Sequence, residues 1–131
     1  MTEQRKPWVS TRAILILVVA LAVAGGVVNL FQAQSRMRQI RSDRLRLAEL
    51  AAANRLSSEA DLGNQEPGPL RDWHAARVKH YADLEARYLR GAAIPSEPMP
   101  PAPEEPPHPS LQELMEWEEA KRSGGASSGG P

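Results

Sequence analysis

The three histidines are the side chains of this sequence that could bind a metal ion or shuttle a proton. His74 and His80 lie six residues apart. That is about 240° around a helix, so they face different directions and cannot chelate a metal as an i, i+4 pair would. His108 lies among prolines, and no acid is placed to orient an imidazole. We therefore expect no catalytic, cofactor or metal site, and ordinary polar surface positions for His74 and His80.

Other chemical signatures are missing from the sequence as well. The absence of cysteine excludes disulfides, thiolate metal ligands and thiol catalysis. No Gly-rich loop follows a strand pattern, and no serine or threonine stands in a nucleophile motif. The sequence thus predicts a protein that is not an enzyme and has no small-molecule substrate. Nucleic-acid binding is not expected either, because the arginines adjoin an apolar run where bilayer phosphates would occupy them first.

That apolar run extends from Ala13 to Phe31, nineteen residues without an ionisable group. As a helix it is about 28 Å long, close to the roughly 30 Å of a bilayer's hydrocarbon core. Its Ile, Leu, Val and Phe residues favour insertion by about 4 to 7 kcal/mol. The run predicts a transmembrane helix over residues 13–32, preceded by a basic flank over residues 1–12.

A cleaved signal peptide is the alternative interpretation of this segment. The small residues that end at Ala24 have the form of a cleavage site after a basic start. Cleavage would release a small secreted protein and would leave residues 27–31 as an apolar terminus. An uncleaved signal anchor fits better, in a bacterial inner membrane or the mitochondrial inner membrane. Short basic N-termini usually stay inside, which favours an N-terminus on the inner side.

Small residues and one amide recur within the apolar run at spacings of four, three and four: Ala22, Gly26, Asn29 and Ala33. Such a side of a helix permits close approach of a second helix, and an intramembrane amide adds about 0.6 kcal/mol by hydrogen bonding. The spacing indicates packing against another membrane helix. Composition alone is the alternative, since Ala and Gly are common in spanning helices and Asn29 lies near the interface.

An arginine-rich segment, residues 33–57, contains no proline and is expected to continue the helix. Its first arginines are candidate ligands for anionic lipid headgroups, at about 1 kcal/mol each: Arg36, Arg38, Arg41, Arg44 and Arg46. A positive-inside signal, or snorkelling without a specific partner, are the alternatives. The same segment carries a narrow apolar stripe, which consists of Ile40, Leu47, Leu50 and Ala51.

A loop rich in glycine and proline, residues 58–68, is expected to separate this helix from a second one over residues 69–91. Pro69 suits a first helical turn, and Gly91 is a natural left-handed cap. The apolar face of this helix supplies candidate partner-docking residues, namely Trp73, Tyr81, Leu84 and Tyr88. Because an isolated helix of this length is only marginally stable, that face must pack on the first helix, on the bilayer or on another protein.

Residues 92–109 are rich in proline, with eight prolines between Ile94 and Pro109. This density predicts an extended, solvated polyproline-type spacer, with a reach of roughly 50 Å at about 3.1 Å per residue. The spacer leads to the C-terminal part of the chain.

Ser110 and Glu113 have the spacing of a capping box, which predicts a short acidic helix over residues 110–122. Gly124 is expected to end it, and residues 123–131 are expected to be disordered. Its apolar residues are candidate partner-docking anchors at the end of the spacer: Leu111, Leu114, Met115 and Trp117. The alternative is a helix that folds back on the chain's own basic segment.

The net charge of zero hides a gradient along the chain. Residues 1–56 carry nine basic and three acidic groups, whereas residues 91–131 carry two and seven. The sequence as a whole predicts an all-α, single-pass membrane protein with a largely disordered proline-rich tail. We expect an accessory subunit or an assembly and tethering factor of a membrane protein complex. A self-associating helical stalk of the cell envelope is the alternative.

Overall fold

The computed structural model describes residues 10–125. Most of the predicted basic flank (residues 1–9) and the end of the predicted Gly/Ser tail (residues 126–131) lie outside the described residues. Across residues 10–125 the secondary structure consists of three helices and no strand, which confirms the all-α prediction. The chain divides into two units, residues 1–39 and residues 40–131. Each is described by itself.

The first unit contains the apolar part of helix α1 (Thr11–Asn64). The helix begins just after Ser10, whose hydroxyl accepts a hydrogen bond from the Ala13 N–H at 3.2 Å, as an N-cap residue does. Every described residue up to Gln39 is exposed. Helix α1 is long and apolar enough to cross a membrane, and none of its most apolar stretch is buried within the chain. The predicted long apolar N-terminal helix is therefore confirmed.

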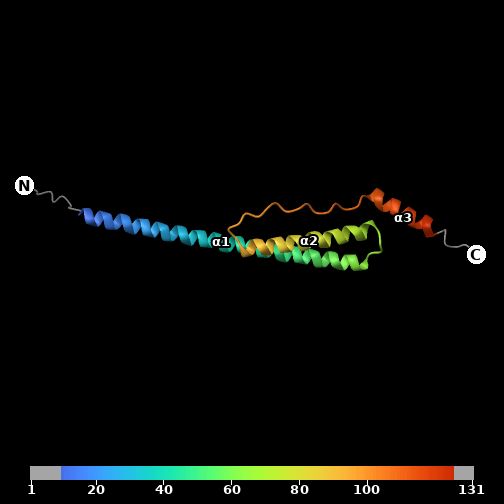
Figure 1. The fold of residues 1–131 in the computed structure, drawn as a ribbon, viewed down its shortest axis with the longest axis horizontal. Coiled ribbons are helices and arrows are strands. Elements are labelled where there is room, and N and C mark those ends of the chain that lie inside the picture. The colour runs from blue at the N-terminus through green and yellow to red at the C-terminus, as the bar shows by residue number, and fades with distance from the viewer. Residues whose placement is uncertain (1–9, 126–131) are drawn as a thin grey trace, which may run out of the picture. The chain divides into compact units, whose positions relative to one another are not determined.

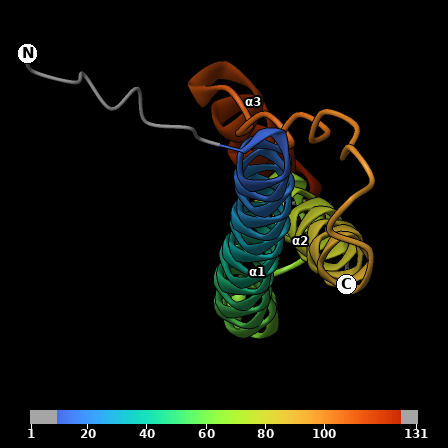
Figure 2. The ribbon, with the colours of Figure 1, turned by 90° about the vertical axis from the view of Figure 1, so that its left-hand side faces the viewer.

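The second unit is built around a helical hairpin. Residues 40–64 of α1 are joined by a short loop to α2 (Pro69–Ala93), which lies antiparallel beside them (Figure 1). An extended segment then leaves the end of α2 and turns back toward the short helix α3 (Leu111–Gly125) (Figure 2). The second amphipathic helix and the short terminal helix are both present, as predicted.

The hairpin is closed by small side chains on α1 and larger ones on α2. On the α1 side Ala48, Ala51 and Ser58 are buried. On the α2 side the buried residues are His74, Tyr81 and Ala92. The small residues let the helix axes approach closely, so that the Tyr81 ring fills the space beside α1.

The predicted apolar stripe of α1 is wrong in two of its four members. Ile40 is half-buried and Ala51 is buried, but Leu47 and Leu50 are 44 % and 55 % exposed. The reason is steric: α2 packs on the alanine side of α1, and the two leucines lie beside that contact rather than in it.

The end of α1 lies later than the sequence indicates. A loop from residue 58 is predicted, whereas the helix continues through Ser58 to Asn64. The Ser58 hydroxyl donates to the Asn54 carbonyl at 2.9 Å, which satisfies it within the helix. Ser58 is also almost fully buried against α2, so packing overrides its preference for loops.

Both glycines predicted to end helices lie within them. Helix α2 continues past Gly91 to Ala93, and no described glycine lies in the left-handed region, so Gly91 is not a left-handed cap. A Cβ atom at Gly91 would lie 2.7 Å from the Met99 sulfur, so the glycine serves close packing instead. Helix α3 extends to Gly125, the last described residue, so Gly124 does not end it.

Candidate functional site

The candidate membrane-packing residues lie on an open helix surface. Ala22, Gly26, Asn29 and Ala33 are all exposed in the first unit. A Cβ atom added at Gly26 would meet no other atom within 4 Å. A neighbouring helix could therefore approach the α1 backbone closely along this side.

Ion pairs tie the two helices of the hairpin together near its middle. Arg55 Nε donates to Glu85 across the hairpin at 2.9 Å, and Arg55 Nη1 lies 3.1 Å from Glu59 on the same helix. The pKa of Arg55 is raised above its ordinary value, first by the hydrogen bond and charge of Glu85 and less by Glu59. These pairs fix how the helices are aligned.

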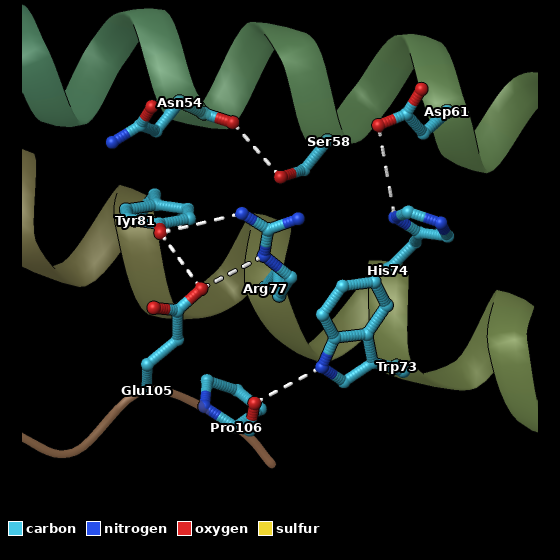
Figure 3. Close-up of polar contacts among 9 residues, drawn as sticks. All are labelled: Asn54, Ser58, Asp61, Trp73, His74, Arg77, Tyr81, Glu105 and Pro106. Carbon is cyan, nitrogen blue, oxygen red and sulfur yellow. Dashed lines mark hydrogen bonds and ion pairs between the residues drawn. The ribbon is translucent and has the colours of Figure 1, made fainter. Parts of the chain in front are cut away.

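His74 occupies a buried position, which corrects the prediction of an ordinary polar surface residue. It is 7 % exposed and faces α1, where its Nδ1 lies 4.0 Å from a carboxylate oxygen of Asp61 (Figure 3). This Nδ1 has no hydrogen-bond partner among the described residues. The correction follows from the hairpin itself, because the same register that buries Tyr81 turns His74, seven residues earlier, toward α1.

Arg44 is bound by the chain itself. Its guanidinium donates to the carbonyls of Gly91 at 2.5 Å, Ile94 at 3.3 Å and Glu97 at 2.9 Å. The last carbonyls of a helix lack partners within the helix, so Arg44 satisfies the end of α2. The prediction that Arg44 binds headgroups is therefore not supported, whereas the other candidate arginines are exposed: Arg36, Arg38, Arg41 and Arg46.

The proline-rich segment is extended, as predicted, but it contacts α2 instead of standing free in solvent. We call residues 95–109 the strap. Most of its side chains are exposed, while its backbone carbonyls accept hydrogen bonds from α2. Arg87 Nη1 donates to Pro101 at 2.6 Å and to Pro100 at 3.2 Å. A polyproline-type chain has no internal hydrogen bonds, so these carbonyls are available to α2 donors.

The strongest strap contacts centre on Trp73, Arg77 and Tyr81 of α2. Trp73 Nε1 donates to the Pro106 carbonyl at 3.0 Å. Arg77 Nε and the Tyr81 hydroxyl both donate to one carboxylate oxygen of Glu105, at 3.0 Å and 2.9 Å (Figure 3). The candidate docking residues Trp73 and Tyr81 thus bind a segment of their own chain. Leu84 and Tyr88 are half-buried.

Helix α3 begins with the predicted capping box. The Glu113 N–H donates to the Ser110 hydroxyl at 3.1 Å, and the Ser110 N–H donates to the Glu113 carboxylate at 2.7 Å. These bonds lower the pKa of Glu113, the backbone bond most. Both partners of the box are therefore satisfied, as the motif requires.

Helix α3 lies against the loop and the start of α2, so it does not stand at the end of a free 50 Å tether. A Cβ atom at Gly68 would lie only 2.7 Å from the Trp117 ring. Lys121 pairs with Glu66, which raises the pKa of Lys121 and lowers that of Glu66 through their hydrogen bond and opposite charges. Of the four candidate anchors in α3, Trp117 and Leu114 are half-buried, whereas Leu111 and Met115 are 75 % and 63 % exposed.

The histidines do not converge on one point. His74 and His108 each lie beside the Trp73 ring, with centroids 4.7 Å and 4.5 Å away, and His80 lies beside Tyr81 instead. Across residues 10–125 no group of three or more histidine, aspartate or glutamate side chains could hold a metal ion. The polar contacts of the second unit instead join segments of this same chain.

The sequence analysis did not single out Arg77 and Glu105, because their contact exists only once the chain folds, and it assigned Arg44 to lipid headgroups rather than to the end of α2. Of the residues that contact the strap, the sequence predicted only Trp73 and Tyr81 as docking residues. Comparisons with protein-family models, curated proteins and solved structures find no match to this chain.

Proposed function

We propose that this chain is a non-catalytic single-pass membrane protein, an accessory subunit or assembly and tethering factor of a membrane protein complex. One observation carries the proposal: the apolar part of α1 has every described side chain exposed. Leaving twelve large apolar residues in water would cost several kcal/mol, whereas a bilayer accepts them at a gain of about 4 to 7 kcal/mol. Residues 13–32 are the proposed membrane anchor, in a bacterial or mitochondrial inner membrane with the N-terminus inside.

Two surfaces are proposed to contact the partner protein. Within the bilayer, the open side at Ala22, Gly26, Asn29 and Ala33 suits close packing of a second helix. Outside it, Leu111 and Met115 leave an exposed apolar edge on α3. The exposed arginines at 36, 38, 41 and 46 are proposed to lie near anionic headgroups, where each contributes about 1 kcal/mol.

A membrane-anchored stalk that self-associates is the second candidate function. It is favoured by the exposure of Leu47 and Leu50, at 44 % and 55 %, on the side of α1 next to the hairpin contact. A second copy could cover these leucines. Chemical crosslinking of the full chain in membranes distinguishes the two candidates, because the stalk yields crosslinks between copies and the accessory subunit yields crosslinks to a different protein.

The test of the membrane contact is a pair of variants. Gly26→Leu with Asn29→Leu should reduce co-purification of the membrane partner several-fold, because the added side chains push the neighbouring helix away. Gly25→Leu is the matched control, since Gly25 is equally open but about 100° around the helix from Gly26. Equal recovery of the partner with both variants would contradict the proposed packing side.

A further inference from the structure

The strap contact has the chemistry of a recognition site. Most side-chain contacts within a fold bury apolar surface, but here an indole donor, a phenol and a guanidinium are all directed at one stretch of extended chain. Proline-rich peptides are recognised in this way in general: aromatic residues line a groove, and an indole N–H donates to a proline carbonyl. Figure 3 shows all three donors on α2, on the side that faces the strap.

The strap contact also distinguishes among proline-rich sequences. A single oxygen of Glu105 accepts from both Arg77 and Tyr81. Arg77 is held in place by the rings on either side, since its guanidinium carbon lies 4.7 Å from the Trp73 centroid and 5.5 Å from the Tyr81 centroid. Charge-assisted hydrogen bonds to a carboxylate are about twice as strong as neutral ones. The strap-facing side of α2 therefore favours a carboxylate directly before the proline whose carbonyl Trp73 binds.

We infer that the strap-facing side of α2, formed by Trp73, Arg77 and Tyr81, is a binding site for acidic proline-rich peptide segments. Its resident ligand is the chain's own Glu105–Pro106. Residues 94–104 connect this ligand covalently to the end of α2. The connection gives the ligand an effective concentration on the order of 1 mM at the site. A free peptide must compete with this internal ligand. This inference does not depend on the proposed function.

A variant that removes the internal ligand and leaves the strap-facing side of α2 intact allows the affinity of the site for a free peptide to be measured. Glu105→Lys places a cation against Arg77 and should release the strap. The probe is a fluorescent peptide that copies residues 101–110, added to the full chain in nanodiscs of neutral phosphatidylcholine. For a peptide Kd of about 0.1 mM, release of an internal ligand at about 1 mM should strengthen binding about tenfold.

The chain offers a matched control one residue away. Glu104→Lys makes the same charge change, but Glu104 has no hydrogen bond or ion pair to α2 in the described structure. It should bind the probe as weakly as the unaltered chain. A second probe, with glutamine in place of the second glutamate, should bind the Glu105→Lys chain several-fold more weakly than the first probe. Glu105→Gln preserves the side-chain shape and should show a smaller gain in probe binding. It replaces Glu105→Lys in the test if that variant loses helicity.

The donors are tested by Tyr81→Phe in the Glu105→Lys background, which removes the hydroxyl and keeps the ring that packs on α1. Probe affinity should fall several-fold with helicity unchanged. Equal probe binding by all chains, or equal binding of the two probes, would overturn the inference. A different outcome is that the unaltered chain forms dimers, and that its probe binding changes with protein concentration. The site would then hold the strap of a second copy, which would contradict the inference that each chain's own Glu105–Pro106 occupies it.

Discussion

Some residues in the second unit allow other side chains to approach the backbone closely, and this matters as much as the apolar character of their neighbours. Gly68 and Gly91 both face side chains that would collide with a Cβ atom, at 2.7 Å in each case. Neither position needs a left-handed backbone, since Gly68 has an extended φ of 161° and no described glycine lies in the left-handed region. The two glycines therefore make room for Trp117, which is 49 residues after Gly68, and for Met99, which is eight residues after Gly91.

Gly68→Ala should displace the Trp117 ring and loosen α3 from the loop. The ring is the far end of a side chain, so we expect it to move while the hairpin remains folded. The indole NMR resonance of Trp117 should shift toward that of an exposed tryptophan. Gly63→Ala is the matched control, because a Cβ atom there meets nothing within 4 Å. An unshifted Trp117 resonance in Gly68→Ala would contradict the contact.

Arg44→Ala should expose the end of α2 to fraying, because three carbonyls lose their donor. Hydrogen bonds to charged groups contribute about 1.5 to 3 kcal/mol each when buried, and these are partly exposed, so we expect a total loss of about 1 to 2 kcal/mol. Amide hydrogen exchange over residues 90–97 should accelerate accordingly. Arg41→Ala, at an exposed arginine one turn earlier, should leave that exchange unchanged.

At the scale of elements, the three helices could be predicted because each has a local signal. The apolar run, Pro69 and the Ser110–Glu113 capping box all lie within one or two turns of the helix they define. The ends of α1 and α2 could not be predicted from local sequence. Ser58 is buried where α1 faces α2, and the Gly91 carbonyl is bound by Arg44, which lies 47 residues earlier. The position of the strap depends on the same long-range contacts.

The candidate site shows the same division. The aromatic residues of α2 could be identified as a face that needs a cover, and Tyr81 is indeed buried. What covers them could not be identified. The register between Glu105 and Arg77, which are 28 residues apart, is set only when the strap returns along α2.

Acid should release α3 from the loop before the hairpin unfolds. The pKa of Glu66 is lowered by Lys121, and that of Glu113 by Ser110, from an ordinary value of 4.5. Ser110 and Glu113 belong to the same capping box, so only the Glu66 pKa depends on docking. Because the Glu66 pKa is lower in the docked state, docking is favoured above about pH 4.5 and is lost as the pH falls through the lowered value. In a titration from pH 7 to pH 3, the Trp117 indole resonance should shift before helicity declines.

Glu66→Gln supplies the control for this titration, since it removes the carboxylate that pairs with Lys121 and should shrink the acid-dependent change. High salt, like acid, should weaken the docking of α3, because salt screens the exposed Lys121–Glu66 pair. If Trp117 moves only together with the global loss of helix, then α3 is not held on the loop by the Lys121–Glu66 pair.

At the scale of the whole molecule, the chain has an exposed apolar helix and a second unit whose long-range polar contacts lie within that unit. The basic and acidic parts of the sequence meet within that second unit, where arginines of α1 and α2 donate to the strap. The first unit has no such internal partners among its described residues. We therefore propose that residues 13–32 lie in a bilayer, next to another membrane helix.

Alkaline carbonate extraction of membranes that contain the full chain tests this requirement most directly. If residues 13–32 span the bilayer, carbonate cannot remove the protein, and the chain should remain in the membrane pellet. The mass of the recovered protein should show that residues 1–24 have not been cleaved off. Recovery of the full-length chain in the supernatant, or of a chain that begins after Ala24, would contradict the account.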